Sequence, residues 1–212
     1  MRFAQLADAS IRVAATPKRS EKVAALAETL RVATDEELPI VVWFLIGRTP
    51  LGRIGVGWSL LADVRPDAAA QATLSVVEVD RALRNLEDTA GTGSQSARRD
   101  QLADLLARAT APEQRLLRGI LGGELRQGAL EGVMTTAVAT AAGVPVAAVR
   151  RAAMMAGDLA VAASAARSGG VDGLAATTLD AFCPVLPMLA STSASVAEAM
   201  DDVGQASVEW KL

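Results

Sequence analysis

The fold of this chain is decided by residues 89–132, which read TAGTGSQSARRDQLADLLARATAPEQRLLRGILGGELRQGALEG. A loop rich in glycine and serine, residues 91–96, leads into a helical pattern that carries Arg98 and Arg99 near its start. A second helical pattern follows, with leucine and isoleucine recurring along one face. A turn bracketed by glycines, residues 122–128, then precedes a third helical pattern. Two glycine turns, each close to arginine, therefore punctuate a helical region.

The two glycine turns have the composition of a phosphate-binding surface. Glycine lets the backbone approach a ligand closely, and a loop that opens a helix presents free N–H groups at the positive end of the helix dipole. Together these features make an anion site. Two such sites separated by one helix suit a repeating polyanion better than one small phosphate. The alternative is that both turns are ordinary helix connectors whose arginines are solvated.

The composition excludes several classes of chemistry without selecting one. The 212 residues suffice for one large domain or two small ones. The sequence has no histidine for acid–base catalysis or metal binding, and its one cysteine, Cys183, allows no internal disulfide framework. The longest apolar run, residues 38–46, is far shorter than a membrane span, and the N-terminus lacks the pattern of a signal segment. We therefore expect a cytoplasmic protein without a membrane partner.

The net charge of −3 is unusual for a protein that binds a polyanion. The charges are unevenly distributed, however. Residues 1–90 carry 11 basic and 12 acidic side chains, residues 91–170 carry 9 and 6, and residues 171–212 carry 1 and 6. The acidity lies largely in the last segment, and the basic excess coincides with the two glycine turns.

Helical spacing and N-capping signals recur along residues 1–175. Thr16-Pro17 has the form of a helix start, with threonine as N-cap and proline at the first helical position. Capping boxes, in which Ser or Thr precedes Glu by three residues, begin at Ser75 and Thr110, and a similar cap at Ser195 opens a short helix. Helices are expected over residues 1–15, 16–30, 35–46, 58–61, 75–86, 96–109 and 110–121, from Gly128 to Gly143, and from Pro145 into the Ala-rich sequence.

These patterns predict an all-α fold, a compact body of many helices in two halves, residues 1–90 and 91–175. No fixed repeat period indicates a solenoid. A strand over residues 40–46 remains possible, although the acidic residues before it favour a helix, because the helix dipole stabilises acids in a first turn.

Several connectors and arginines allow two interpretations. The glycine-punctuated connector 47–57 is either a further contact with the polyanion or a loop tucked under Trp58. Arg115 and Arg118 lie on the polar side of their helix and are interpreted as solvated or paired. The pair 150–151 is interpreted as exposed rather than as a contact site.

The residues of the glycine turns resemble a known family. Gly93-Ser94 followed by Arg98-Arg99, and then the turn 123–128 with sequence GELRQG, is similar to the N-terminal DNA-binding domain of ATP-dependent DNA ligases. In that family a Gly-Ser loop, a basic pair, a helix pair and a G-(K/E)-L-R-x-G turn follow in this order. Residues 51–58 also resemble the family's turn at that position. The similarity extends over essentially the whole chain, and it is strongest with ligases of actinobacteria.

The last part of the chain resembles the connection to a second domain in these ligases. Residues 182–190, FCPVLPMLA, contain two prolines and are expected to be extended. Residues 208–212 alternate like the start of a strand. Lys211 matches the lysine of the family's Lys-x-Asp-Gly motif, whose Asp and Gly are absent because the sequence stops at Leu212. The chain is therefore expected to be a piece truncated just after the adenylation-motif lysine.

The resemblance implies two domains and a division of labour between them. Residues 1–175 would form the helical DNA-binding domain, and residues 176–212 the linker and first strand of a truncated nucleotidyltransferase (adenylation) domain. The whole enzyme would seal nicks: Lys211 would attack the α-phosphate of ATP, with Mg²⁺ as divalent metal, and the lysyl-adenylate would pass AMP to the 5′-phosphate. This chain alone is expected to bind neither ATP nor metal, and to be inactive.

The resemblance also implies a partner, nicked double-stranded DNA, held by a monomer near the nucleoid through contacts that do not read sequence. The residues expected to contact DNA are Gly91, Gly93, Ser94, Gln95, Ser96, Arg98, Arg99, Gly123, Leu125, Arg126 and Gly128. The competing hypothesis is a helical protein-interaction module that binds no nucleic acid, which the acidic net charge favours. A different enzyme class has less support, because the sequence contains no candidate acid–base cluster.

Overall fold

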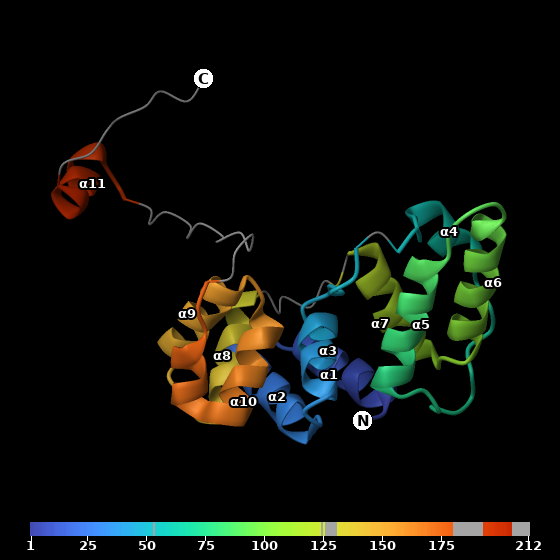
Figure 1. The fold of residues 1–212 in the computed structure, drawn as a ribbon, viewed down its shortest axis with the longest axis horizontal. Helices are drawn as coiled ribbons and strands as arrows, with labels where there is room; N and C mark the ends of the chain where they lie inside the picture. Colours follow the sequence, from blue (N-terminus) through green and yellow to red (C-terminus); the bar gives the residue numbers. More distant parts are fainter. Residues whose placement is uncertain (53, 124, 126–130, 180–192, 205–212) are drawn as a thin grey trace.

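The computed structural model of the chain describes residues 1–52, 54–123, 125, 131–179 and 193–204 (Figure 1). Within these ranges there are eleven α-helices, an isolated antiparallel bridge between Arg2 and Ser75, and no strand. The helices are α1 (Phe3–Ala15), α2 (Arg19–Val32), α3 (Glu37–Leu45), α4 (Trp58–Asp63), α5 (Val76–Asp88), α6 (Ser94–Ala107), α7 (Ala111–Gly122), α8 (Glu131–Ala142), α9 (Val146–Ala156), α10 (Leu159–Ala176) and α11 (Val196–Val203). The predicted all-α fold is confirmed, and residues 40–46 belong to a helix and its C-cap rather than to a strand.

The helices from α1 to α10 form two groups on either side of α1 and α3 (Figure 1). In one group α9 packs along α10 and α2 packs along α8; the other group contains α4, α5, α6 and α7. α1 contacts α2 and α7, and α3 contacts α5 and α10, so both groups are tied to the same central pair. The groups are not the predicted halves 1–90 and 91–175, because α2 buries its apolar face against helices of the second half.

Three of the predicted N-caps are confirmed. At Ser75 the hydroxyl accepts from the Glu78 amide at 3.2 Å, while the Glu78 carboxylate accepts from the Ser75 amide at 2.8 Å. Thr110 and Glu113 form the same box at the start of α7. The hydroxyl of Ser195 accepts from the Glu198 amide at the start of α11. Each box satisfies amides that the first turn of a helix leaves without partners.

Several helix boundaries differ from the prediction. α2 begins at Arg19 rather than at Pro17, because the Thr16 hydroxyl accepts from the Lys18 amide and caps a turn before the helix. α6 begins at Ser94, two residues earlier than predicted. The Ala-rich sequence after Pro145 is divided between α9 and α10, since Gly157 has φ +66° and Asp158 caps α10 by accepting from the Ala160 amide at 2.7 Å. α10 itself is kinked at Gly170, where φ is +56°.

The core is built from leucine, alanine and valine, with a few aromatic side chains. Phe3 of α1 and Phe44 of α3 are fully buried and meet edge to face, their ring centroids 6.1 Å apart. This contact fixes the end of α3, from which the chain leaves for the connector 47–57. No single helix of the described ranges is long and apolar enough to cross a membrane; α8 and α9 pass that test only as a pair, bent by 119°.

Glu37, at the start of α3, is a buried acid held by two partners. Its carboxylate accepts from the N-terminal ammonium of Met1 and, at 3.0 Å, from the Thr34 amide. Burial raises the pKa of Glu37, but the hydrogen bonds from the ammonium and from Thr34 outweigh burial and leave the pKa below its ordinary value. The folded state therefore holds the ionised form of Glu37 more strongly than the unfolded chain does.

We expect Glu37→Gln to flatten the acid side of the stability profile. A carboxyl whose pKa is lowered by folding adds stability above its unfolded pKa, about 4.3, and this contribution is lost as pH falls through the folded pKa. Urea unfolding at pH values from 7 down to 3 should show a shallower decline for Glu37→Gln than for the wild-type chain. The exposed neighbour Glu36, changed to Gln, is the matched control and should keep the wild-type slope. Identical slopes for wild type and Glu37→Gln would contradict this account.

Candidate nucleic-acid interface

Three glycine-containing segments meet at one edge of the molecule: the connector 47–57, the loop 89–93 and the end of α7 (Figure 1). The connector touches both of the others. A Cβ at Gly55 would lie 2.7 Å from the guanidinium carbon of Arg98, and a Cβ at Gly47 would lie 2.8 Å from the Cβ of Leu125. The connector thus contacts Arg98 of α6 near one end and Leu125, which follows α7, at the other. We call these three segments the glycine edge.

The loop 89–93 turns sharply into α6. Gly91 and Gly93 have φ values of +86° and +82°, and Gly93 is the N-cap of α6. The amide of Ser94 donates to the Gly91 carbonyl, and the helix then opens with the exposed residues Gln95 and Ser96. No acidic side chain lies in this first turn. The positive end of the α6 dipole and its first free amides therefore face solvent at the glycine edge.

Arg98 is engaged by the fold. Its Nε donates to the Leu86 carbonyl at 3.2 Å, and its Nη2 donates to the Thr89 carbonyl. Its Nη1 lies 3.5 Å from the Ser94 hydroxyl. The side chain joins the end of α5 to the start of α6 beneath Gly55. A contact between Arg98 and DNA stays a prediction. In the structure, the hydrogen bonds of this side chain hold the loop in position.

Arg99 points to the other side of the same turn. Its Nη2 donates to Asp63 of α4 at 3.0 Å, and both side chains are about half exposed, so the ion pair is open to solvent. The pair lies beside a groove of about 470 Å³. The groove is lined by Gly55, Gly57, Ser59, Leu60, Asp63, Gln95, Ser96 and Arg99. An exposed pair contributes little to stability, so Arg99 is able to exchange its partner for a phosphate.

The second predicted turn is described only in part. Gly123 has φ +66° and caps the C-terminal end of α7. The side chain of Leu125 is partly buried and packs over Gly47 and Gly119. Arg126 and Gly128, both predicted to contact DNA, lie outside the described residues, as does Arg53 of the connector.

The remaining arginines resolve two of the open interpretations. Arg118 is not solvated, since it donates to the carbonyls of Leu61 and Val64. Arg150 is exposed, as expected. The indole of Trp58 packs on Gly122 at the end of α7, and the residue is 68% exposed, so these contacts do not support the loop interpretation of the connector 47–57. Within the described part of the chain, no group of three or more His, Cys, Asp or Glu residues could hold a metal ion.

Residues 61–139 match the protein family described as DNA ligase N terminus. Over the whole chain, 50% of residues are identical to a protein named "Probable DNA ligase" from Streptomyces griseus, of which 41% is covered. A protein of the same name from Mycolicibacterium gilvum is 51% identical over 96% of this chain, with 40% of its own length covered. One from Anaeromyxobacter dehalogenans strain 2CP-1 is 50% identical over the whole chain, with 42% covered.

The resemblance to DNA ligases is thereby confirmed. The chain spans about two-fifths of the length of these relatives. The matched family region runs from α4 to α8 and so includes the loop that opens α6, the whole of α7 and the turn after it. Two parts of the glycine edge lie in this ligase N-terminal region, and the connector 47–57 lies just before it.

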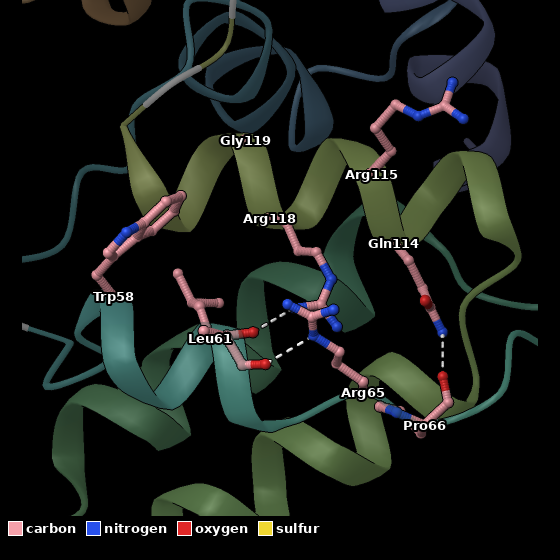
Figure 2. A pocket seen from close by; sticks show the side chains of 9 residues that line it. Trp58, Leu61, Arg65, Pro66, Gln114, Arg115, Arg118 and Gly119 are labelled. Atoms are coloured by element: carbon pink, nitrogen blue, oxygen red, sulfur yellow. Dashed lines mark hydrogen bonds between the residues drawn. The ribbon is translucent and has the colours of Figure 1, made fainter.

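Sequence reasoning missed a second basic site in the ligase N-terminal region, between α4 and α7 (Figure 2). Arg65 and Arg118 converge there, with Trp58 at the rim. Burial lowers the pKa of Arg118, and the nearby charge of Arg65 lowers it further. The available signal was the spacing of Trp58 and Arg65 around a short helix: Trp58 is the first residue of α4, and Arg65 follows its C-cap, Val64.

Proposed function

We propose that this chain is the DNA-binding part of an ATP-dependent DNA ligase, which holds nicked duplex DNA without reading its sequence. The observation that carries the proposal is the identity of about 50% to probable DNA ligases along the whole chain. The glycine edge supports it. A nick arises at any sequence, so contacts to the phosphate backbone, which position a protein without reading bases, suit the task.

The glycine edge offers phosphates backbone amides and two arginines. The first amides of α6 supply N–H donors at a positive helix end. Arg99 supplies a guanidinium that pairs with Asp63 in the absence of DNA. Arg48, exposed on the connector, supplies a further charge. Arg98, held beneath Gly55, keeps the loop in place when phosphates are bound.

The rest of the proposed activity belongs to a longer protein. In that protein Lys211 would receive AMP from ATP, with Mg²⁺ as the metal, and the monomeric enzyme would work in the cytoplasm on chromosomal DNA. The proposed contribution of the described residues is the contact with the duplex. The proposed use of ATP and a metal and the proposed sealing of nicks therefore rest on two observations: the printed name of the relatives and the match of Lys211 to the family motif.

A salt titration of duplex binding tests the DNA-binding proposal. The chain should bind nicked duplexes of unrelated sequence with equal affinity, because each neutralised phosphate contributes about −0.9 to the slope of log K against log salt whatever the bases are. Arg99→Gln should reduce the slope by about one unit. The matched control is Arg108→Gln, at the far end of α6, where Arg108 pairs with Glu78; it should keep the wild-type slope.

Two outcomes would contradict the proposal. Affinity that changes strongly with base sequence at constant salt would rule out a backbone grip. Absence of binding at low salt, with the chain folded by circular dichroism, would favour the protein-interaction module that the acidic net charge suggests.

A further inference from the structure

The pocket between α4 and α7 is distinct from the amides of the α6 start. It has a volume of about 590 Å³. Its lining residues are Trp58, Leu61, Ala62, Arg65, Pro66, Gln114, Arg115, Arg118 and Gly119. Three of these are arginines and none is an acid. Figure 2 shows that Arg65 and Arg118 meet inside the pocket, whereas Arg115 points away from it.

Arg118 forms a fixed floor for this pocket. Its Nη1 donates to the Leu61 carbonyl at 2.5 Å and its Nη2 to the Val64 carbonyl at 2.6 Å. Both carbonyls lie at the end of α4, where a helix leaves acceptors without intrahelical partners. The guanidinium is therefore held in one orientation by the backbone, and it adds a positive charge without bringing an acid with it.

Arg65 lies beside Arg118 with most of its hydrogen-bonding capacity unused. Its Nε donates to the Ala62 carbonyl at 2.7 Å, and in the described part of the chain its two terminal amino groups have no acceptor. By contrast, the arginines Arg84, Arg99, Arg108 and Arg167 pair with carboxylates. Two neighbouring guanidiniums without an acid repel each other, and an anion bound between them removes that repulsion.

Trp58 adds an apolar surface at the mouth of the pocket. One part of its indole packs on Gly122: a Cβ added at Gly122 would lie 3.2 Å from Cζ3 of the ring. The residue is 68% exposed. Figure 2 shows the ring against the C-terminal end of α7, on the same side as the two guanidiniums. A large exposed aromatic ring beside uncompensated arginines suits a ligand that is flat at one end and anionic at the other.

We propose that this pocket binds one nucleotide unit, with its phosphate on Arg65 and Arg118 and its base against Trp58. The inference rests on the proposed function in one respect: bound DNA would be the natural source of the nucleotide, at a strand end or an unstacked position. A free nucleotide has the same chemistry, and the experiment separates the two sources.

The test uses thymidine 3′,5′-bisphosphate as a probe of the complete chain, followed by tryptophan fluorescence. The wild-type chain should show saturable quenching that Trp58→Phe abolishes, which assigns the signal to Trp58 rather than to Trp43 or Trp210. Arg65→Gln should weaken binding about tenfold or more, since a charge-assisted phosphate contact is lost, and Arg65→Lys should restore part of it. Arg65 is exposed and makes one hydrogen bond, so the melting temperature should be unchanged. Arg150→Gln, exposed on α9, is the control for net charge.

A second arm repeats the titration with nicked duplex DNA. If Arg65→Gln weakens binding of both probes and Arg150→Gln of neither, the pocket serves the DNA. If it weakens binding of the bisphosphate only, the pocket takes a free nucleotide. If the wild-type chain binds duplex but shows no Arg65-dependent quenching by the bisphosphate, the nucleotide site is refuted while the proposed function stands. If it binds the bisphosphate but no duplex, the site stands and the proposed function fails.

Discussion

Gly47→Ala should destabilise the chain by about 2–5 kcal/mol, because it combines a left-handed backbone with a collision. Gly47 has φ +76° and ends α3: its amide donates to the Phe44 carbonyl at 3.1 Å, and the Arg48 amide donates to the Trp43 carbonyl at 3.0 Å. These two bonds form the Schellman motif, which favours glycine. The collision arises because an added Cβ would lie 2.8 Å from the Cβ of Leu125.

The same substitution should weaken binding to nicked duplex, because relief of the collision moves Leu125 and with it the turn at the end of α7. Urea unfolding and duplex titration of one preparation measure both effects. Gly57→Ala is the matched control: it lies in the same connector, has an ordinary φ of −84°, and a Cβ there would have no neighbour within 4 Å. Its cost should be at most about 1 kcal/mol, the difference between glycine and alanine at an N-cap. Equal stability of both variants would refute the proposed role of Gly47.

The elements that sequence predicted well are those whose determinants lie within a few residues. The capping boxes at Ser75 and Thr110 involve partners three residues apart, so the pattern and the contact coincide. The break between α9 and α10 is also local, but Gly157 and Asp158 lie in an Ala-rich stretch whose helical propensity hides it. The alanine content of this stretch therefore predicted one continuous helix, whereas the positive φ of Gly157 and the N-cap at Asp158 divide it.

The assembly of the two groups of helices had no local signature. α2 packs along α8, and Arg31 of α2 donates to the Thr140 carbonyl at 3.0 Å across 109 residues of chain. Such contacts depend on which apolar faces meet, and helical spacing alone specifies a face without specifying its partner. For this reason the division into residues 1–90 and 91–175 was wrong although the fold class was right.

The candidate site shows the same limit. The family resemblance located the loop 91–96 and the turn 123–128, but it treated Arg98 and Arg99 alike. The structure separates them, since Arg98 is tied to the carbonyls of Leu86 and Thr89 while Arg99 forms an exposed pair with Asp63. The partners of Arg98 are unpaired carbonyls at the end of α5, and no charge pattern in a sequence reports an unpaired carbonyl.

Lys211→Ala should reduce the labelling of the longer protein by α-³²P-ATP to background. In the proposed reaction the Nζ of Lys211 forms a bond to the α-phosphorus of ATP, the bond to pyrophosphate breaks, and the ammonium has lost its proton beforehand. A lysine attacks only as the free amine, so its surroundings must lower its pKa or hold a base nearby. Alanine has no atom that could take the place of Nζ, and the expected loss is therefore complete rather than partial.

The other lysines of the chain make this test specific. Lys18, just before α2, is exposed and pairs with Glu21 at 2.9 Å, so Lys18→Ala removes an amine of the same kind without touching the proposed chemistry. It should label as strongly as the wild-type protein. In the wild-type protein the label should be lost in acid and retained in alkali. The reason is that AMP is joined to lysine by a phosphoramidate bond, which acid hydrolyses, rather than by an ester bond. If Lys211→Ala still accepts the label, the nucleophile lies elsewhere, and the match of Lys211 to the Lys-x-Asp-Gly motif has no catalytic meaning.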